Sequence, residues 1–130
     1  MRNFREYDIW RSAIRIAKVV YEITASFPPS EKYGLSSQIQ RASVSISSNI
    51  AEGCSRYSET DFARFLEISL GSTFEVENQM ILAAEFGYVT EEQLNDFAVE
   101  IAVLQKQINT LITKIRHKPM VGSQQPTANS

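Results

Sequence analysis

Apolar residues recur at alternating steps of three and four between residues 94 and 115. The positions are Leu94, Phe97, Ile101, Leu104, Ile108, Leu111 and Ile115. Such steps return to one side of an α-helix, because a turn takes 3.6 residues. A seam this regular is suited to antiparallel packing against other helices. The segment therefore predicts a helix within a bundle, and T-E-E-Q at residues 90–93 predicts a capping box at its start.

A second amphipathic segment runs from about residue 8 to residue 26. Its apolar stripe contains Ile9, Ile16, Val20, Ile23 and Phe27, and an adjoining stripe widens the apolar arc. The opposite face is charged, with Arg11, Arg15, Lys18 and Glu22. Pro28 and Pro29 follow, and proline disfavours helical geometry in the residue before it. We expect a helix that ends at this pair of prolines.

The stretch R-A-S-V-S-I-S-S-N-I-A-E-G at residues 41–53 fits two structures. Ala42 to Ile46 alternates apolar residues with serine, which is typical of a half-buried strand. A helical spacing competes with it and extends over nineteen residues, through Leu35, Ile39, Ala42, Ile46, Ile50 and Gly53. The longer pattern favours a helix. Its weak intrinsic propensity implies a central position held by packing, with serine hydroxyls bonded to the carbonyl four residues earlier.

A further helix is expected from Ser58 to about Phe86, where Gly87 provides a stop. The S-E-T-D sequence at residues 58–61 predicts a capping box, and apolar residues cover most of the helix circumference. A helix coated in this way is central or forms a second interface. The sequence thus predicts an all-α, antiparallel up-down-up-down four-helix bundle. It forms a single domain over residues 1–117, and the composition of residues 118–130 is typical of a disordered tail.

The charge is distributed unevenly along the chain. Residues 1–57 contain eight Lys or Arg and five Asp or Glu, whereas residues 58–130 contain five and ten, which sums to a net charge of -2. One cysteine allows no internal disulfide, the N-terminus has no signal-type apolar run, and no apolar stretch approaches the length of a membrane span. We expect a soluble cytoplasmic protein without a membrane partner.

The sequence offers little material for catalysis. His117 lies at the end of the last predicted helix, and Cys54 has no neighbour in the sequence that would lower its pKa. A di-metal site in a bundle needs Glu-x-x-His motifs, and none occurs. Gly53 follows a helix, whereas a phosphate loop places its glycines ahead of one. We therefore predict no enzymatic activity, no cofactor, no metal and no small-molecule substrate.

Two groups of polar residues are candidate sites. The first is a buried polar network in which Arg41 meets carboxylates and an amide; its members are Arg41, Asn49, Glu52, Glu75 and Glu77. The second is a nucleic-acid surface, since cations along a helix face are suited to phosphates. Its members are Arg5, Arg11, Arg15, Lys18, Lys114 and Arg116. For both groups the alternative is a set of solvated side chains without a shared role.

Five motifs together point to a known family. They are D-I-W at residues 8–10, F-P-P-S-E-K-Y-G-L-S-S-Q-I-Q-R-A-S-V-S-I-S-S-N-I-A-E-G at 27–53, F-A-R-F-L-E-I-S-L-G-S at 62–72, E-V-E-N-Q at 75–79 and G-Y-V-T-E-E-Q at 87–93. With these motifs the chain resembles the four-helix-bundle proteins encoded in intervening sequences of bacterial 23S rRNA genes. The resemblance implies a homopentamer without enzymatic activity. A similar protein accompanies the reverse transcriptase of diversity-generating retroelements, where a basic pentamer engages nucleic acid and the polymerase.

Two functions are consistent with these features. The first is a non-enzymatic, oligomeric helical-bundle protein whose main partner is itself, with subunit contacts on the broad apolar arcs of the first and third helices. The second is an accessory protein that binds RNA, or a nucleic-acid enzyme, through the basic face of the first helix. The overall pI of about 5.4 differs from that of a basic RNA-binding ring.

Overall fold

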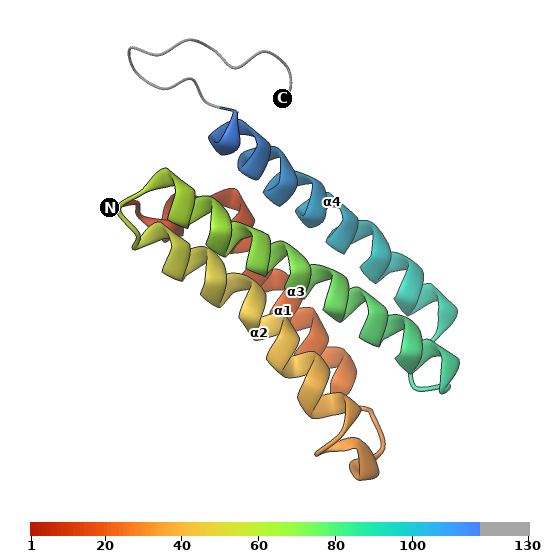
Figure 1. Cartoon of the computed structure of the whole chain (residues 1–130). Helices are drawn as coiled ribbons and strands as arrows, with labels where there is room; N and C mark the ends of the chain where they lie inside the picture. The colour runs from red at the N-terminus through yellow and green to blue at the C-terminus, as the bar shows by residue number, and fades with distance from the viewer. Residues whose placement is uncertain (118–130) are drawn as a thin grey trace, which may run out of the picture.

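The computed structural model describes residues 1–117 and contains four long helices (Figure 1). They are α1 (Asp8–Thr24), α2 (Leu35–Cys54), α3 (Glu59–Glu85) and α4 (Glu91–Arg116), with short 3-10 helices η1 (Phe4–Glu6) and η2 (Pro29–Glu31). Within these residues the chain forms no strand, so the predicted all-α four-helix class is confirmed. The predicted tail at residues 118–130 lies outside the described residues.

Consecutive helices pack side by side, and short turns join them (Figure 1). The hydroxyl of Ser69 donates to the Ile46 carbonyl at 2.8 Å, and the hydroxyls of Ser72 and Ser45 lie 2.8 Å apart. Residue numbers rise on α3 as they fall on α2, so these two helices are antiparallel. The arrangement is compatible with up-down-up-down topology. Among neighbouring pairs, α1 and α4 make the fewest contacts.

The core lies along the bundle axis and takes one apolar stripe from each helix. Its fully buried side chains include Ile16, Ile46, Leu66, Met80 and Ile101. The predicted stripe of α4 is buried at Phe97, Ile101, Leu104 and Ile108, whereas Leu94, Leu111 and Ile115 are only partly buried. Burial of such side chains, at about 1.5–3 kcal/mol each, is the main force holding the helices together.

The serine-rich stretch at residues 41–53 lies entirely within α2, so the helical interpretation is confirmed. Ser43 is buried, and its hydroxyl donates to the Gln40 carbonyl at 2.8 Å. Ser47 bonds the Val44 carbonyl in the same way. These bonds return three residues along the helix rather than the predicted four. The serines therefore satisfy their hydroxyls locally while leaving α2 thin enough for close packing.

Two glycines occupy positions where the structure disfavours any side chain. A Cβ on Gly53 would lie 2.8 Å from the Cβ of Phe65 and 3.2 Å from Cδ1 of Phe62, so α2 can meet α3 this closely only without a side chain here. Gly87 has φ +83° just beyond α3, a conformation that side chains disfavour. Both positions are the helix-terminal glycines that the sequence marked.

The helix starts agree with the predicted caps in part. Thr90 and Gln93 form a full capping box at the start of α4. The Ser58 hydroxyl accepts from the Asp61 amide at 3.0 Å, but the reciprocal bond from the Asp61 carboxylate is not formed among the described residues. Aspartate is one methylene shorter than the glutamate usual at that position, which accounts for the missing half.

Across residues 1–117, no helix is both long enough and apolar enough to pass through a bilayer.

Candidate interaction surfaces

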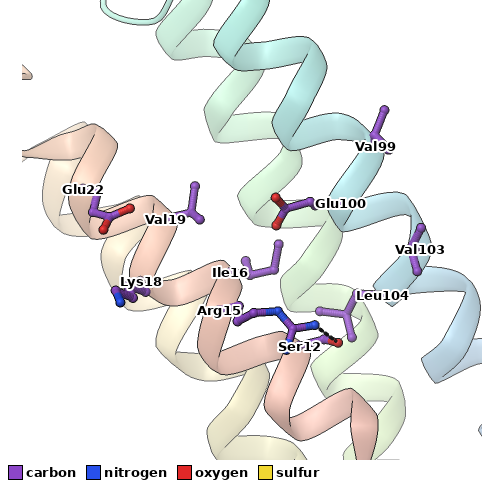
Figure 2. A pocket seen from close by; sticks show the side chains of 10 residues that line it. All are labelled: Ser12, Arg15, Ile16, Lys18, Val19, Glu22, Val99, Glu100, Val103 and Leu104. Carbon is purple, nitrogen blue, oxygen red and sulfur yellow. Dashed lines mark hydrogen bonds between the residues drawn. The ribbon is translucent and has the colours of Figure 1, made fainter.

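A groove of about 610 Å³ opens between α1 and α4, where the bundle packs most loosely (Figure 2). Its floor is formed by Ile16 and Leu104, which also belong to the core. Val99 and Val103 stand on the α4 side, with 68% and 53% of their surface exposed. The groove thus presents apolar side chains to solvent at a seam between two helices.

Charges of both signs line the same groove. Arg15 and Lys18 project from α1, whereas Glu22 of α1 and Glu100 of α4 contribute carboxylates (Figure 2). The Arg15 guanidinium donates to the Ser12 hydroxyl at 3.0 Å and makes no ion pair within residues 1–117. No cysteine or histidine lines this groove. The groove therefore combines exposed apolar side chains with charges of both signs.

The predicted basic residues of the first helix are all exposed and lie on η1 and the outer side of α1. The Arg5 guanidinium stacks on the ring of Phe4, 4.5 Å from its centroid. Arg11 pairs with Asp8 and donates to the Arg5 carbonyl at 2.6 Å. Lys18 lies two turns further along the same face. Helical spacing places Arg11, Arg15 and Lys18 on one face of α1, while Arg5 precedes this helix on η1.

The two predicted cations of α4 lie in its last turn and have different surroundings. Arg116 forms an ion pair with Glu67 of α3 at 2.8 Å. Lys114 lines a hollow together with Arg2, Tyr7 and Glu59. Neither hollow nor groove gathers all six predicted cations into one site.

The predicted polar network is divided among separate local pairs. Asn49 donates to the Ser45 carbonyl at 2.8 Å, and Glu52 pairs with Arg56 at 3.0 Å. Glu77 accepts a bond from Gln105 of α4 at 2.9 Å. Arg41 and Glu75 line one polar cleft between α2 and α3, without an ion pair between them in the described chain. Both side chains are exposed, so water solvates them and burial does not force them together.

Cys54 and His117 are the two side chains that the sequence offered for catalysis. Over residues 1–117, no group of three or more His, Cys, Asp or Glu could hold a metal ion. Cys54 is fully buried, and burial raises the pKa of its thiol, with the nearby Arg2 acting in the opposite direction. His117 is exposed just after α4. A protonated, inaccessible thiol is a poor nucleophile.

The outer side of α3 carries a further apolar surface. Phe74 is 55% exposed and Ile81 45%, and the two lie seven residues apart, on the same side of the helix. Gly71 lies one turn before Phe74. The sequence indicated this surface by the apolar coating of the whole helix, but not which residues face outward. That assignment depends on how α3 is rotated between α2 and α4.

The family described as "23S rRNA-intervening sequence protein" matches residues 5–110. The chain belongs to this family. The chain is also similar to a solved structure, a protein of unknown function from the S23 ribosomal protein family of Bacteroides thetaiotaomicron, with 25% identity and a TM-score of 0.72. The match covers 80% of this chain and 97% of that one. No curated protein matches the chain.

Membership of the 23S rRNA-intervening sequence family agrees with the resemblance drawn from the motifs. The long 27–53 motif spans the turn before α2 and most of α2 itself. The two groove valines, Val99 and Val103, were not singled out from the sequence of this family member. The signal that could have indicated them is a pair of apolar residues on the otherwise polar outer side of α4.

Proposed function

We propose that this protein is a non-enzymatic, self-assembling helical bundle, a homopentamer, that acts as a scaffold in the cytoplasm. The observation that carries the proposal is the set of apolar side chains left in water on the outer sides of the helices, above all Phe74 on α3 and Val99 and Val103 on α4. Clustered exposed apolar surface marks interaction sites in folded proteins. A buried lone thiol suits a reducing compartment.

Two observations favour assembly over a reaction. Cys54 is buried, and over residues 1–117 no group of three or more His, Cys, Asp or Glu could hold a metal ion. The number five comes from the resemblance rather than from the geometry of one chain. A scaffold requires a stable fold and exposed surfaces that contact other molecules, and this bundle has both.

The test is multi-angle light scattering on a sizing column, with absorbance read at 260 and 280 nm across the peak. A particle of five times the 14.7 kDa chain mass with a protein spectrum supports the proposal. A monomer at about 10 μM would contradict it. A dimer, trimer or tetramer would retain self-assembly and overturn the number five.

A second candidate function is binding of nucleic acid through the basic face of α1. The observation that favours it is the exposure of Arg5, Arg15 and Lys18 on one side, together with the stacking of Arg5 on Phe4. Reversal of charge at Arg11 and Arg15 should then abolish RNA retention on a filter at low salt. A matched change at Arg41, on the other side of α2, serves as the control. Equal retention by both variants would rule out this face.

A further inference from the structure

The outer side of α1 carries a stripe of alternating cations and apolar residues, which we name the α1 seam. Its members are Arg11, Ile14, Lys18 and Tyr21, at steps of three, four and three. All four are exposed, and Ile14 and Tyr21 keep 42% and 48% of their surface in water. This spacing is that of a helix face that packs along another helix. Within residues 1–117 no helix covers it.

The outer side of α3 carries a matching stripe, the α3 seam. Its members are Glu67, Gly71, Phe74, Asn78, Ile81 and Glu85, at alternating steps of four and three. All six are exposed. Phe74 and Ile81 are seven residues apart, as Ile14 and Tyr21 are in the α1 seam. The two apolar pairs are therefore spaced equally, about 10 Å apart along each helix.

Packing within the chain does not require a glycine at position 71. A Cβ built on it meets no atom within 4 Å, whereas a Cβ on Gly53 would collide with Phe65. Glycine inside a helix is destabilising relative to alanine, so its presence in the fourth turn of α3 has a cost that packing in the monomer does not offset. A bare backbone beside Phe74 does permit another helix to approach closely. The use for this gap therefore lies outside the single chain.

The two seams have opposite charge. The α1 seam contains two cations and no carboxylate, and the α3 seam contains two carboxylates and no cation. From residue 65 to residue 105 the chain has eight Asp or Glu and no Lys or Arg. Two α3 seams would repel each other, as would two α1 seams. Arg11 and Glu67 already pair with Asp8 and Arg116, but exposed ion pairs of this kind are weak enough to exchange partners.

The helices that carry the seams are not neighbours in the bundle. The backbone of α1 lies next to those of α2 and α4, whereas it does not approach the backbone of α3 among the described residues. One chain therefore presents its two seams in different directions at the same time. The groove between α1 and α4 is a weaker candidate for receiving α3, because it mixes Arg15 and Lys18 with Glu22 and Glu100.

We infer that the α3 seam of one copy packs along the α1 seam of the next, so that copies join head to tail. This inference rests on the proposed self-assembly and assigns its contact surfaces. Phe74 and Ile81 pack against Ile14 and Tyr21, Gly71 lets the two backbones approach, and the charges of the seams select the pairing of unlike surfaces. A head-to-tail contact leaves one free seam at each end of a dimer, and it continues until a ring closes.

The experiment uses two variants, each with one seam neutralised. Variant A carries Phe74→Gln and Ile81→Gln, and variant B carries Ile14→Gln and Tyr21→Gln. Each keeps the opposite seam intact. Val44→Gln on α2, at a position 43% exposed and outside both seams, is the control. Circular dichroism confirms that every variant is folded, which is expected because all these side chains point outward.

Light scattering then measures the mass of each variant and of the mixture. A and B alone should be monomers of about 14.7 kDa, the control should keep the wild-type mass, and an equal mixture of A and B should form a 1:1 heterodimer. The heterodimer arises because the α1 seam of A meets the α3 seam of B, while the remaining two seams are disabled. Gly71→Leu should weaken wild-type assembly by at least roughly tenfold in dissociation constant, about 1.4 kcal/mol.

The remaining outcomes separate this inference from the proposed function. If A and B retain the wild-type mass, the seams are not the interface, although self-assembly stands. If A or B alone forms a dimer, its intact seam pairs with the same seam of another copy, which overturns the head-to-tail contact. If both are monomers and the mixture is also monomeric, the two intact seams do not bind each other, which overturns it as well. A monomeric wild-type protein overturns the proposed function itself. An assembly that nuclease dissolves would replace both with binding of nucleic acid.

Discussion

The phenolic hydroxyl of Tyr88 donates a hydrogen bond to Oε2 of Glu31, at 2.9 Å. The other carboxylate oxygen of Glu31 accepts from the backbone amide of Leu35 at 3.0 Å, at the start of α2. The ring of Tyr88 also packs on Phe27, with centroids 5.4 Å apart. One carboxylate thus joins the turn that precedes α2 to the turn that precedes α4, and so closes one end of the bundle.

Glu31→Gln should make the stability of the protein less dependent on acid pH. The backbone bond from Leu35 and then the bond from Tyr88 lower the pKa of Glu31 below its ordinary value of 4.5. A carboxylate with a lowered pKa stabilises the folded state above pH 4.5, and this contribution is lost as the pH falls through the folded value. Urea unfolding of both proteins from pH 7 to pH 3 measures the difference, which should shrink toward acid pH.

Tyr88→Phe is the matched control for the carboxylate. It removes one of the two bonds and keeps the ring against Phe27, so its pH dependence should lie between those of the wild type and Glu31→Gln. A difference between wild type and Glu31→Gln that stays constant from pH 7 to pH 3 would show that the Glu31 charge makes no contribution.

Gly53→Ala and Gly71→Ala should change the stability of the chain in opposite directions. At Gly53 the new Cβ collides with Phe65, and overpacking of this kind costs about 1–3 kcal/mol. At Gly71 the Cβ meets nothing, so the higher helix propensity of alanine should stabilise the monomer by about 0.5–1 kcal/mol.

Denaturant unfolding at a protein concentration low enough to keep the chain monomeric measures both effects. The two substitutions are chemically identical and both lie in helices, so each serves as the control for the other. Equal effects at the two sites would mean that the close approach of α2 and α3 at Gly53 is not a stabilising feature.

Cys54 should be unreactive toward a thiol reagent in the folded protein at pH 7. Its side chain is fully buried, so the reagent does not reach the sulfur. Burial also raises the pKa of the thiol, which keeps it protonated. The amide of Arg2 donates to the Cys54 carbonyl at 3.1 Å, which holds the N-terminal segment over this end of α2. Labelling should therefore become fast only in denaturant.

Removal of residues 1–6 is the informative comparison for Cys54. The shortened chain should label faster than the full chain without denaturant, because the segment that contains Arg2 is gone. Rapid labelling of the intact protein, at the rate of a free thiol, would show that the end of the bundle opens readily.

Thr90→Ala should destabilise the protein by about 1 kcal/mol, since it removes a hydrogen bond to the first turn of α4. Gln93→Ala removes only the reciprocal bond to the Thr90 amide and should have a smaller effect. Thermal unfolding compares the two. A loss at Gln93 that exceeds the loss at Thr90 would contradict the assigned roles.

The local features of this fold could be predicted from the sequence because they depend on near neighbours. The prolines after α1, the Thr90 cap and the glycine after α3 act over a few residues, so helix limits agree within two residues at most ends. The 3-4 spacing of the 35–53 segment also prevailed over a five-residue alternation, because helical burial collects more contacts over a longer stretch.

The predicted polar network did not form, for two different reasons. Asn49 and Glu52 bond residues four positions away in the sequence, Ser45 and Arg56, and these local partners compete with a distant one. Glu77 bonds Gln105 of α4, a contact that depends on how α3 is rotated toward α4. The sequence could place Arg11, Arg15 and Lys18 on one face, because all three lie on the same helix. Whether any of these residues binds a partner stays a prediction.

By itself, the sequence determined that this chain forms four helices, where they begin and end, and that its two halves differ in charge. Only the tertiary structure decided that α1 and α4 pack loosely, that Phe74 and Ile81 face water, and that Gly71 has empty space beside it. The physical reason is that helix formation follows from local spacing and caps, whereas exposure follows from the choice of neighbours. That choice is made by packing of the whole core, to which every helix contributes.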